Sequence, residues 1–399
     1  MRSKSPRARF LAAGITAVLT MAACGSDDAN STGNESLTTN APTAESPSTN
    51  PPGTNPPGTN APTAETPTTG APMTAATEVP AVEATPADAG YAYASNVDGH
   101  RLVVKDICEV KELLDAETVD YDAINALYTD GKNSVKGDGF RTLGGFASGE
   151  GKKHGLAEFY AVPAPINDFV SSAIVGTGLF EGATDDVRAQ GIEKGTQNQN
   201  MVAWVVHELN SAVSKAEEGN FDIAKGAVHN WDEGWAFYAG AEPGCGPYGT
   251  ADKRGENFGT LTDDGGSVAN AAILAAMVSG RDALLASDVE GAKAASADVI
   301  KNVVVTYSQA AIRYATKIQA DVAEGDDAAA TKHIAEGLAF WRVIEAYVTP
   351  AGADGDTMNA IYALDGTPGA NGGGDAVRAA LQPAWDTFGI TDADIGTLD

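Results

Sequence analysis

Apolar residues recur every three or four positions over most of the chain from about Tyr91 onward, and strict alternation of apolar and polar residues is scarce. The first pattern is typical of amphipathic helices, and the second would indicate strands. The periodicity predicts helices over Tyr121–Tyr128, Thr196–Glu218, Phe221–Ala239, Gly266–Ala286, Val289–Glu324, Asp326–Val348 and Asp375–Phe388. Gly291 is expected to interrupt the longest of these helices. We therefore expect an all-α fold.

Two pairs of these helices are predicted to form antiparallel hairpins. Gly219-Asn220 and Gly325-Asp326 separate successive helices, and such a short connection favours antiparallel neighbours. A Glu-Gly-x-Ala-Phe-aromatic core begins at Glu233 and recurs at Glu336. The repeat indicates a duplicated helical unit, although alanine-rich helices also align easily by chance.

The duplication gives a register between the two halves. With about three residues of slack, it places Arg313 opposite His207. We expect two related helical bundles, at approximately residues 101–250 and 251–399. Glycine and proline concentrate in stretches predicted to be long loops, namely Gly131–Gly151, Gly240–Gly265 and Pro350–Gly374.

The N-terminus has the pattern of an export signal. Basic residues from Arg2 to Arg9 precede an apolar run from Phe10 to Ala23, which is too short to span a bilayer. Residues 1–23 are therefore predicted to be a lipoprotein signal peptide, because Cys24 directly follows small residues, as in the bacterial lipobox. Acylation of Cys24 would anchor the exported protein to the outer face of the cell membrane. The alternative is an ordinary signal peptide with a coincidental cysteine.

The next segment, residues 24–88, consists largely of Thr, Pro, Ala, Asn and Ser. Such a composition buries too little apolar surface to offset chain entropy, so we expect a disordered tether. The folded domain is predicted to span residues 89–399.

The net charge limits the kinds of partner that we expect, and the cysteine content indicates a disulfide. The formal net charge is −28, and nothing forms a basic patch, so nucleic acid is excluded as an expected partner. Cations suit this charge, although an acidic surface also serves solubility alone. Besides Cys24, only Cys108 and Cys245 occur, and an exported protein favours a disulfide between them.

The most informative cluster for chemistry lies in the helix that follows Gly219-Asn220. His229 and Glu233 are four residues apart and share a helix face, and Asp232 lies at its edge. One nitrogen and two oxygen ligands so placed suit a divalent or trivalent metal ion. The alternative is that His229 only packs against nearby tryptophans.

Two further residues are candidate ligands. His207 and His229 lie at similar distances from Gly219, so they are expected at one level of the hairpin, as in metal sites of helical bundles. Glu336 repeats the position of Glu233, and either completes the site or pairs with Arg342 or Arg313.

Other residues are weaker candidates. His333 lies off the register of His229, His154 and Glu158 form a separate pair, and His100 is expected at the surface. His207-Glu208 begins like a zincin motif but lacks its second histidine, and no nucleophile elbow or phosphate-binding loop occurs.

Several segments resemble one known family. They are Gly131–Ser134, Gly191–Gln197, Val206–Leu209 and His229–Gly240, which are similar to the iron-assimilating, high-CO2-inducible periplasmic proteins of green algae. The resemblance covers about Arg101 to Asp399 and implies an extracellular protein implicated in iron uptake. More distantly, the helix resembles imelysin-like lipoproteins with a His-x-x-Glu motif, a family linked to iron transport with some members classed as peptidases. Asp232 replaces the motif's glutamate here.

These observations predict an exported, lipid-anchored protein that captures iron and presents it to a transporter or permease, with another divalent metal as the alternative cargo. The predicted metal ligands are His207, His229, Asp232, Glu233 and Glu336. A carrier needs no catalysis, and no catalytic residue is assigned. A metal-dependent ferroxidase or HxxE-type peptidase is the enzymatic alternative, and a non-catalytic structural protein of the cell envelope is the third.

Overall fold

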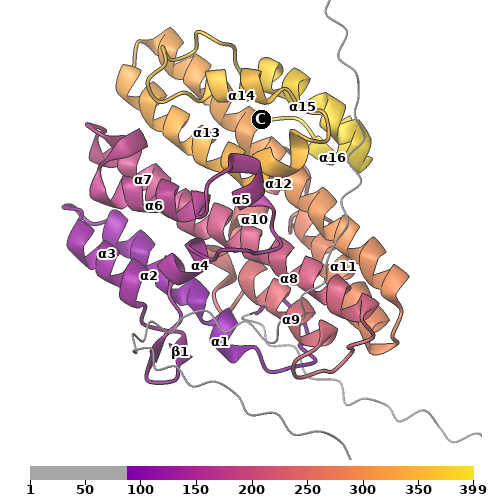
Figure 1. Ribbon diagram of the computed structural model, residues 1–399. Helices are drawn as coiled ribbons and strands as arrows, with labels where there is room; N and C mark the ends of the chain where they lie inside the picture. Colours follow the sequence, from indigo (N-terminus) through magenta and orange to yellow (C-terminus); the bar gives the residue numbers. More distant parts are fainter. Residues whose placement is uncertain (1–87) are drawn as a thin grey trace, which may run out of the picture.

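The computed structural model describes residues 88–399, which form an almost entirely helical protein (Figure 1). This confirms the all-α prediction. The predicted signal peptide, Cys24 and the tether up to residue 87 lie outside the described residues. Asp88 was predicted to end the tether, but its side chain is buried, and its Oδ1 lies 2.6 Å from Nη2 of Arg101.

The first part of the domain is a series of short helices. They are α1 (Asp98–Arg101), α2 (Val103–Leu114), α3 (Tyr121–Asp130), α4 (Leu143–Ala147), α5 (Leu156–Tyr160) and α6 (Pro165–Val175), followed by the 3₁₀ turn η2 (Gly178–Phe180). Between α3 and α4, strands β1 (Val135–Lys136) and β2 (Gly139–Phe140) form an antiparallel hairpin in which Val135 pairs with Phe140. These strands form the single sheet within residues 88–399.

A continuous helical rod crosses the middle of the sequence. It consists of α7 (Asp185–Lys194), the π-helical turn η3 (Gly195–Asn200) and α8 (Met201–Glu217). All the residues of η3 are buried. Within η3, Oδ1 of Asn198 accepts hydrogen bonds from the Tyr307 hydroxyl at 2.8 Å and the Thr250 hydroxyl at 2.7 Å. A buried polar turn therefore connects α7 to α8.

Helix α9 (Ala227–Tyr238) packs against α8 and completes the first predicted hairpin. The helix was predicted to begin at Phe221, and this boundary is wrong. Oδ1 of Asp222 accepts hydrogen bonds from the backbone N–H groups of Ala224 at 3.0 Å and Lys225 at 2.8 Å. This Asx-type turn competes with helix formation, so α9 begins only at Ala227.

The second half contains the longest helices. They are α10 (Pro247–Asn257), α11 (Val268–Leu285), α12 (Val289–Glu324), α13 (Asp327–Val348), α14 (Gly355–Ile361), α15 (Gly374–Phe388) and α16 (Asp392–Ile395), with the 3₁₀ turn η4 (Pro243–Cys245) before α10. The predicted break in α12 is wrong. Gly291 lies in the first turn, where its N–H is capped by Oδ1 of Asp288 at 3.0 Å, so it costs the helix little.

Three helices of the domain lie in stretches predicted to be loops. Helices α4, α10 and α14 occupy parts of Gly131–Gly151, Gly240–Gly265 and Pro350–Gly374. Pro247 begins α10, where a missing N–H carries no penalty and the fixed φ favours the helix. The density of glycine and proline therefore marked helix ends rather than uninterrupted loops.

Helix α12 lies at the centre of the domain. It packs against α8, α11, α13 and α15, and Figure 1 shows it running from the C-terminal helices toward α11. Buried apolar side chains from both halves form one core, which includes Trp231, Trp235, Trp341 and Trp385. Of the described helices, α11 is long and apolar enough by composition to cross a membrane, but it packs against α9 and α12 as a core helix does. The predicted division into two related bundles stays a prediction.

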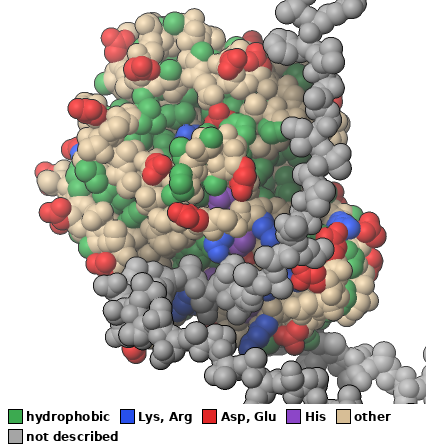
Figure 2. Space-filling model, in the orientation of Figure 1, with side chains coloured by type: hydrophobic (Ala, Val, Ile, Leu, Met, Phe, Trp, Pro, Cys, Tyr) green, Lys and Arg blue, Asp and Glu red, His purple; other side chains and the backbone are tan. Residues whose placement is uncertain are grey.

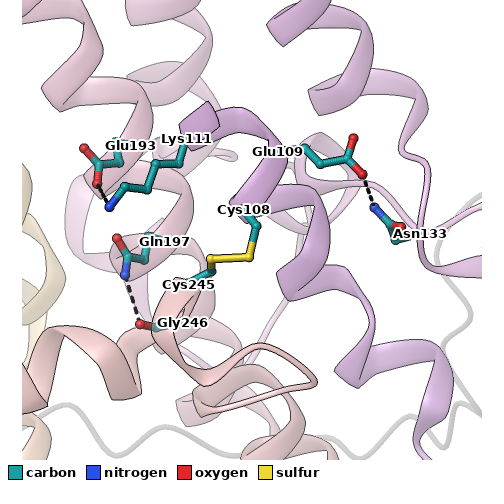
Figure 3. Close-up of a disulfide and its surroundings, with 8 residues drawn as sticks. All are labelled: Cys108, Glu109, Lys111, Asn133, Glu193, Gln197, Cys245 and Gly246. Carbon is teal, nitrogen blue, oxygen red and sulfur yellow. Dashed lines mark hydrogen bonds and ion pairs between the residues drawn. A yellow bond between two sulfur atoms is a disulfide. The ribbon is translucent and has the colours of Figure 1, made fainter. Parts of the chain in front are cut away.

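A disulfide joins Cys108 of α2 to Cys245 of η4, with 5.4 Å between their Cα atoms, as Figure 3 shows. Next to it, Nε2 of Gln197 donates a hydrogen bond to the carbonyl oxygen of Gly246 at 3.0 Å. The bridge spans 137 residues of sequence and therefore encloses both α8 and α9 in one covalent ring.

Candidate functional site

The pair predicted on α9 forms as the helical spacing requires. Nε2 of His229 lies 3.1 Å from Oε1 of Glu233, one helical turn away. Nδ1 of His229 lies 3.1 Å from the hydroxyl oxygen of Ser95, in the segment that precedes α1. The His229 ring is thus held at both of its nitrogens.

A second imidazole reaches the same carboxylate oxygen. Nδ1 of His100, in α1, lies 2.9 Å from Oε1 of Glu233. The side chain of His100 is only 18% exposed, so the expectation that it is a surface residue is wrong. Burial alone would raise the pKa of Glu233, but hydrogen bonds from His100 and His229 hold that pKa well below its usual range. Glu233 is therefore the ionised centre of the site.

A second carboxyl group faces this centre from α8. Glu208 is 4% exposed, and one of its oxygens makes a short hydrogen bond with Nδ2 of Asn230. The same Asn230 nitrogen lies 3.2 Å from Oε2 of Glu233. Burial, followed by the charge of Glu233, raises the pKa of Glu208 well above its usual value. The two neighbouring glutamates thus differ in proton affinity. Glu208 was not selected from the sequence, where its neighbour His207 was chosen as the ligand on this helix.

His207 faces a different set of groups. Its Nδ1 accepts a hydrogen bond from the backbone N–H of Lys153 at 2.9 Å, and its ring meets the Trp204 ring edge-on at 4.9 Å. Burial, together with the charge of Lys152, lowers the pKa of His207 to about 3. The ring is therefore neutral, and its Nδ1 is occupied by the Lys153 N–H.

His154 is held in the same way, in the loop before α5. It is 4% exposed, and its Nδ1 accepts the backbone N–H of Leu156 at 3.1 Å. Burial lowers the pKa of His154 to about 4.

On the face drawn in Figure 2, histidine side chains appear beside lysine and arginine side chains near the middle, whereas acidic side chains are spread over the surface.

Asp232 makes a structural contact instead of joining Glu233. It is fully buried, and its carboxylate accepts hydrogen bonds from the Tyr91 hydroxyl at 2.9 Å, the Ala94 N–H at 2.9 Å, the Ser95 N–H at 2.7 Å and the Ser95 hydroxyl at 2.8 Å. Both oxygens are thereby occupied by the chain that leads into α1. Asp232 holds in place the segment that carries His100. It therefore lies beside the site, with both of its carboxylate oxygens already hydrogen-bonded.

Glu336 lies in a separate environment on α13. Its Oε1 accepts a short hydrogen bond from the Tyr314 hydroxyl and lies 3.9 Å from Nζ of Lys194. None of these partners contacts Glu233. His333, the other residue of the second hairpin considered as a ligand, is bound to Asp321 at 2.5 Å.

The five predicted ligands therefore separate into four environments. His229 and Glu233 lie together, and the structure adds His100 and Glu208, which the sequence analysis did not select. Within residues 88–399, no group of three or more His, Cys, Asp or Glu side chains is arranged to hold a metal ion. His100 and His229 instead bind the Glu233 oxygen through their protons, so these donors converge on a carboxylate and not on an open point.

Comparison with known protein families gives a match over residues 70–399 to the family described as low iron-inducible periplasmic protein. The match agrees with the resemblance noted from the sequence and extends beyond the segments that carried it. A search of curated proteins and a search of solved structures each found no match.

Proposed function

This chain belongs to the low iron-inducible periplasmic protein family, an exported family whose description links it to iron, and from that premise we propose that it captures iron outside the cytoplasm. The proposed ligands are His100, His229 and Glu233, with Glu208 as a fourth. The observation that carries the proposal is that two imidazoles lie within hydrogen-bond distance of the Glu233 carboxylate, so that three side chains of types that bind iron are already grouped.

The chemistry of these donors suits iron. Imidazole nitrogens and carboxylate oxygens together bind iron and other first-row transition metals. Because His100 and His229 lie within hydrogen-bond distance of a carboxylate oxygen, each must carry a proton on the nitrogen that faces it. An incoming iron ion would replace these protons, so uptake should release protons and strengthen as the pH rises.

The position of the site suits reversible capture. The side chains of His100 and His229 are 18% and 23% exposed, whereas that of Glu233 is 9% exposed. Iron would therefore approach from the side of the imidazoles and meet the ionised carboxylate behind them. The lipid anchor at Cys24 and the tether complete the proposal, because they would hold the loaded protein near a transporter or permease that takes the iron.

The test is iron uptake by the full-length exported protein purified without chelator. The parent should bind about one iron per chain, and a His229→Ala/Glu233→Ala variant should lose most of it. His333→Gln is the matched control, because His333 is bound to Asp321 away from the site and its loss should leave uptake unchanged. Equal uptake by the double variant and the parent would overturn the assignment.

The same preparation separates a carrier from an enzyme. Fe(II) added in air should be bound without sustained oxygen consumption if the protein only carries iron. Continued oxygen consumption that disappears in the His229→Ala/Glu233→Ala variant would instead identify a ferroxidase at the same residues.

A further inference from the structure

Basic side chains from three helices lie near Tyr314, Glu336 and Glu193, in a protein whose net charge is strongly negative. We call this group the cationic cluster. Its members are Lys194 of α7, Lys253 and Arg254 of α10, and Arg313 and Lys317 of α12. Arg313 and Lys317 are one turn apart and so share a face of α12.

Arg254 is the buried member of the cluster. It is 6% exposed, and no carboxylate within residues 88–399 lies within ion-pair distance of it. Its Nε atom is buried without a hydrogen-bond partner. The guanidinium lies 5.7 Å from the Tyr314 ring and 5.9 Å from the Phe340 ring. A buried guanidinium with an unpaired N–H is costly unless something outside the protein satisfies it.

The other members surround Arg254 with like charge. The guanidinium of Arg313 lies 5.2 Å from the centre of the same Tyr314 ring, and it too has no ion-pair partner among the described residues. Burial, then the charge of Arg313, lowers the pKa of Lys317. Burial, then neighbouring lysines and Arg254, lowers the pKa of Lys253. These shifts mean that the cations lie close enough to repel one another.

The nearby carboxylates are already engaged, two of them by Lys194 of the cluster itself. Glu336 accepts the Tyr314 hydroxyl and lies 3.9 Å from Lys194. Glu193 binds Lys194 at 2.7 Å. Asp321 binds His333 at 2.5 Å. Arg254, Arg313, Lys253 and Lys317 therefore have no carboxylate within ion-pair distance in the described part of the chain, and Nζ of Lys317 lies 3.3 Å from Nε2 of His333.

We propose that Arg254, Arg313 and Lys317 form a binding site for a small, multiply charged oxyanion. The unpaired Nε–H of Arg254 would donate to one oxygen of the anion, and the half-buried Arg313 and Lys317 would supply further charge-assisted hydrogen bonds. A multiply charged anion would also remove the mutual repulsion of the cations. Phosphate, sulfate and small polycarboxylates share this chemistry.

The predicted duplication relates this site to the first hairpin. In that register Arg313 corresponds to His207, and Glu336 corresponds to Glu233. At that position the second hairpin would then hold an arginine where the first holds a histidine. The proposal does not rest on iron binding, because none of its residues contacts His100, His229 or Glu233.

The test is calorimetric titration of the metal-free, full-length protein with sodium phosphate, sodium sulfate and sodium citrate, at an ionic strength fixed with sodium chloride. We expect at least one of the three to bind with a Kd on the order of 0.1 mM or tighter. The Arg313→Gln/Lys317→Met variant should weaken that binding by roughly tenfold or more. These two positions are preferred over Arg254, whose burial makes its replacement a risk to folding.

Two controls make the result specific. Lys332→Met removes a lysine that is 40% exposed and lies 3.8 Å from Asp186, and it should leave anion binding unchanged. The His229→Ala/Glu233→Ala variant should also retain anion binding, which separates this site from the iron site. No binding above the chloride background, or equal binding by the parent and the Arg313→Gln/Lys317→Met variant, would overturn the proposal.

Discussion

Nδ1 of His100 lies 2.9 Å from Oε1 of Glu233, although the two residues come from distant parts of the sequence. The contact joins the short helix α1 to the middle of α9, where His229 already holds the same oxygen. The local helical pair thus becomes a three-residue group only when the N-terminal segment docks. Residues before α2 therefore contribute directly to the candidate site.

Replacement of His100 by alanine should weaken iron binding while leaving His229 and Glu233 in place. We expect the affinity to fall by at least about tenfold, because one of the proposed ligands and its hold on Glu233 are lost together. Competition with a chelator of known affinity measures the change. An unchanged affinity would show that His100 only packs beside the carboxylate.

Asp232→Ala should destabilise the protein and release the segment that carries His100. The buried carboxylate accepts hydrogen bonds from Tyr91, Ala94 and Ser95, so its removal leaves several donors unpaired. The free energy of unfolding should fall by at least about 3 kcal/mol in urea titrations. Amide hydrogen exchange of residues 88–101 should also accelerate. The exposed Asp263→Ala is the control, and unaltered exchange in Asp232→Ala would contradict the role of Asp232 as a fastener.

Stability should fall in mild acid through His154. Burial lowers its pKa to about 4 in the folded protein, whereas an unfolded histidine titrates near its usual value of about 6.5. Its stabilising contribution is therefore complete above about pH 6.5 and is lost as the pH falls toward 4, because only the unfolded chain binds the proton. Between pH 7.5 and pH 5.0 His154 should account for a loss of about 2 kcal/mol, in addition to a similar loss from His207, whose pKa burial also lowers.

The control for this pH effect is His154→Asn. The asparagine oxygen can still accept the Leu156 N–H that Nδ1 of His154 now accepts, but it does not titrate. Urea unfolding at both pH values should show a smaller loss in the variant than in the parent. The same loss in both would place the acid sensitivity elsewhere.

The two glycines of the repeated Glu-Gly core should respond differently to alanine. A Cβ at Gly337 would lie 2.2 Å from the buried Tyr362 ring, so Gly337→Ala should cost about 1–3 kcal/mol by overpacking. A Cβ at Gly234 would meet Leu209 at an ordinary 3.5 Å, so Gly234→Ala should be neutral or stabilise α9 by up to about 1 kcal/mol. Thermal and urea unfolding of both variants test the contrast, and equal costs would contradict it.

Local patterns predicted the part of the site that is local. His229 and Glu233 are one turn apart in one helix, so periodicity alone places them side by side. His100 reaches them through tertiary docking, which no periodicity encodes, and it therefore looked like a surface residue. Asp232 has the right residue type and lies at the edge of the right helix face. Its role became visible only with the donors of Tyr91 to Ser95 in place.

The same division applies to the fold. The ends of long periodic helices such as α12 and α13 were predicted to within one residue or so, because apolar positions recur many times along each helix. Helix α10 was missed, since its glycines and Pro247 resemble loop residues while its packing is set by neighbouring helices. The Glu-Gly repeat gave Glu336 as a ligand, but Glu336 contacts Tyr314 and Lys194, whereas Glu233 contacts His100 and His229. A repeated sequence can therefore occur in two different chemical environments.

The disulfide between Cys108 and Cys245 divides the proposed iron ligands into two groups. Glu208, His229 and Glu233 lie within the covalent ring that the disulfide closes, whereas His100 lies in the segment that precedes the ring. That segment is held by noncovalent contacts alone, among them its hydrogen bonds to Asp232. A pulling force on the N-terminal end would therefore separate His100 from Glu233 before it strained the disulfide-closed ring. Under such a force, His100 would be the first of the proposed iron ligands to be lost.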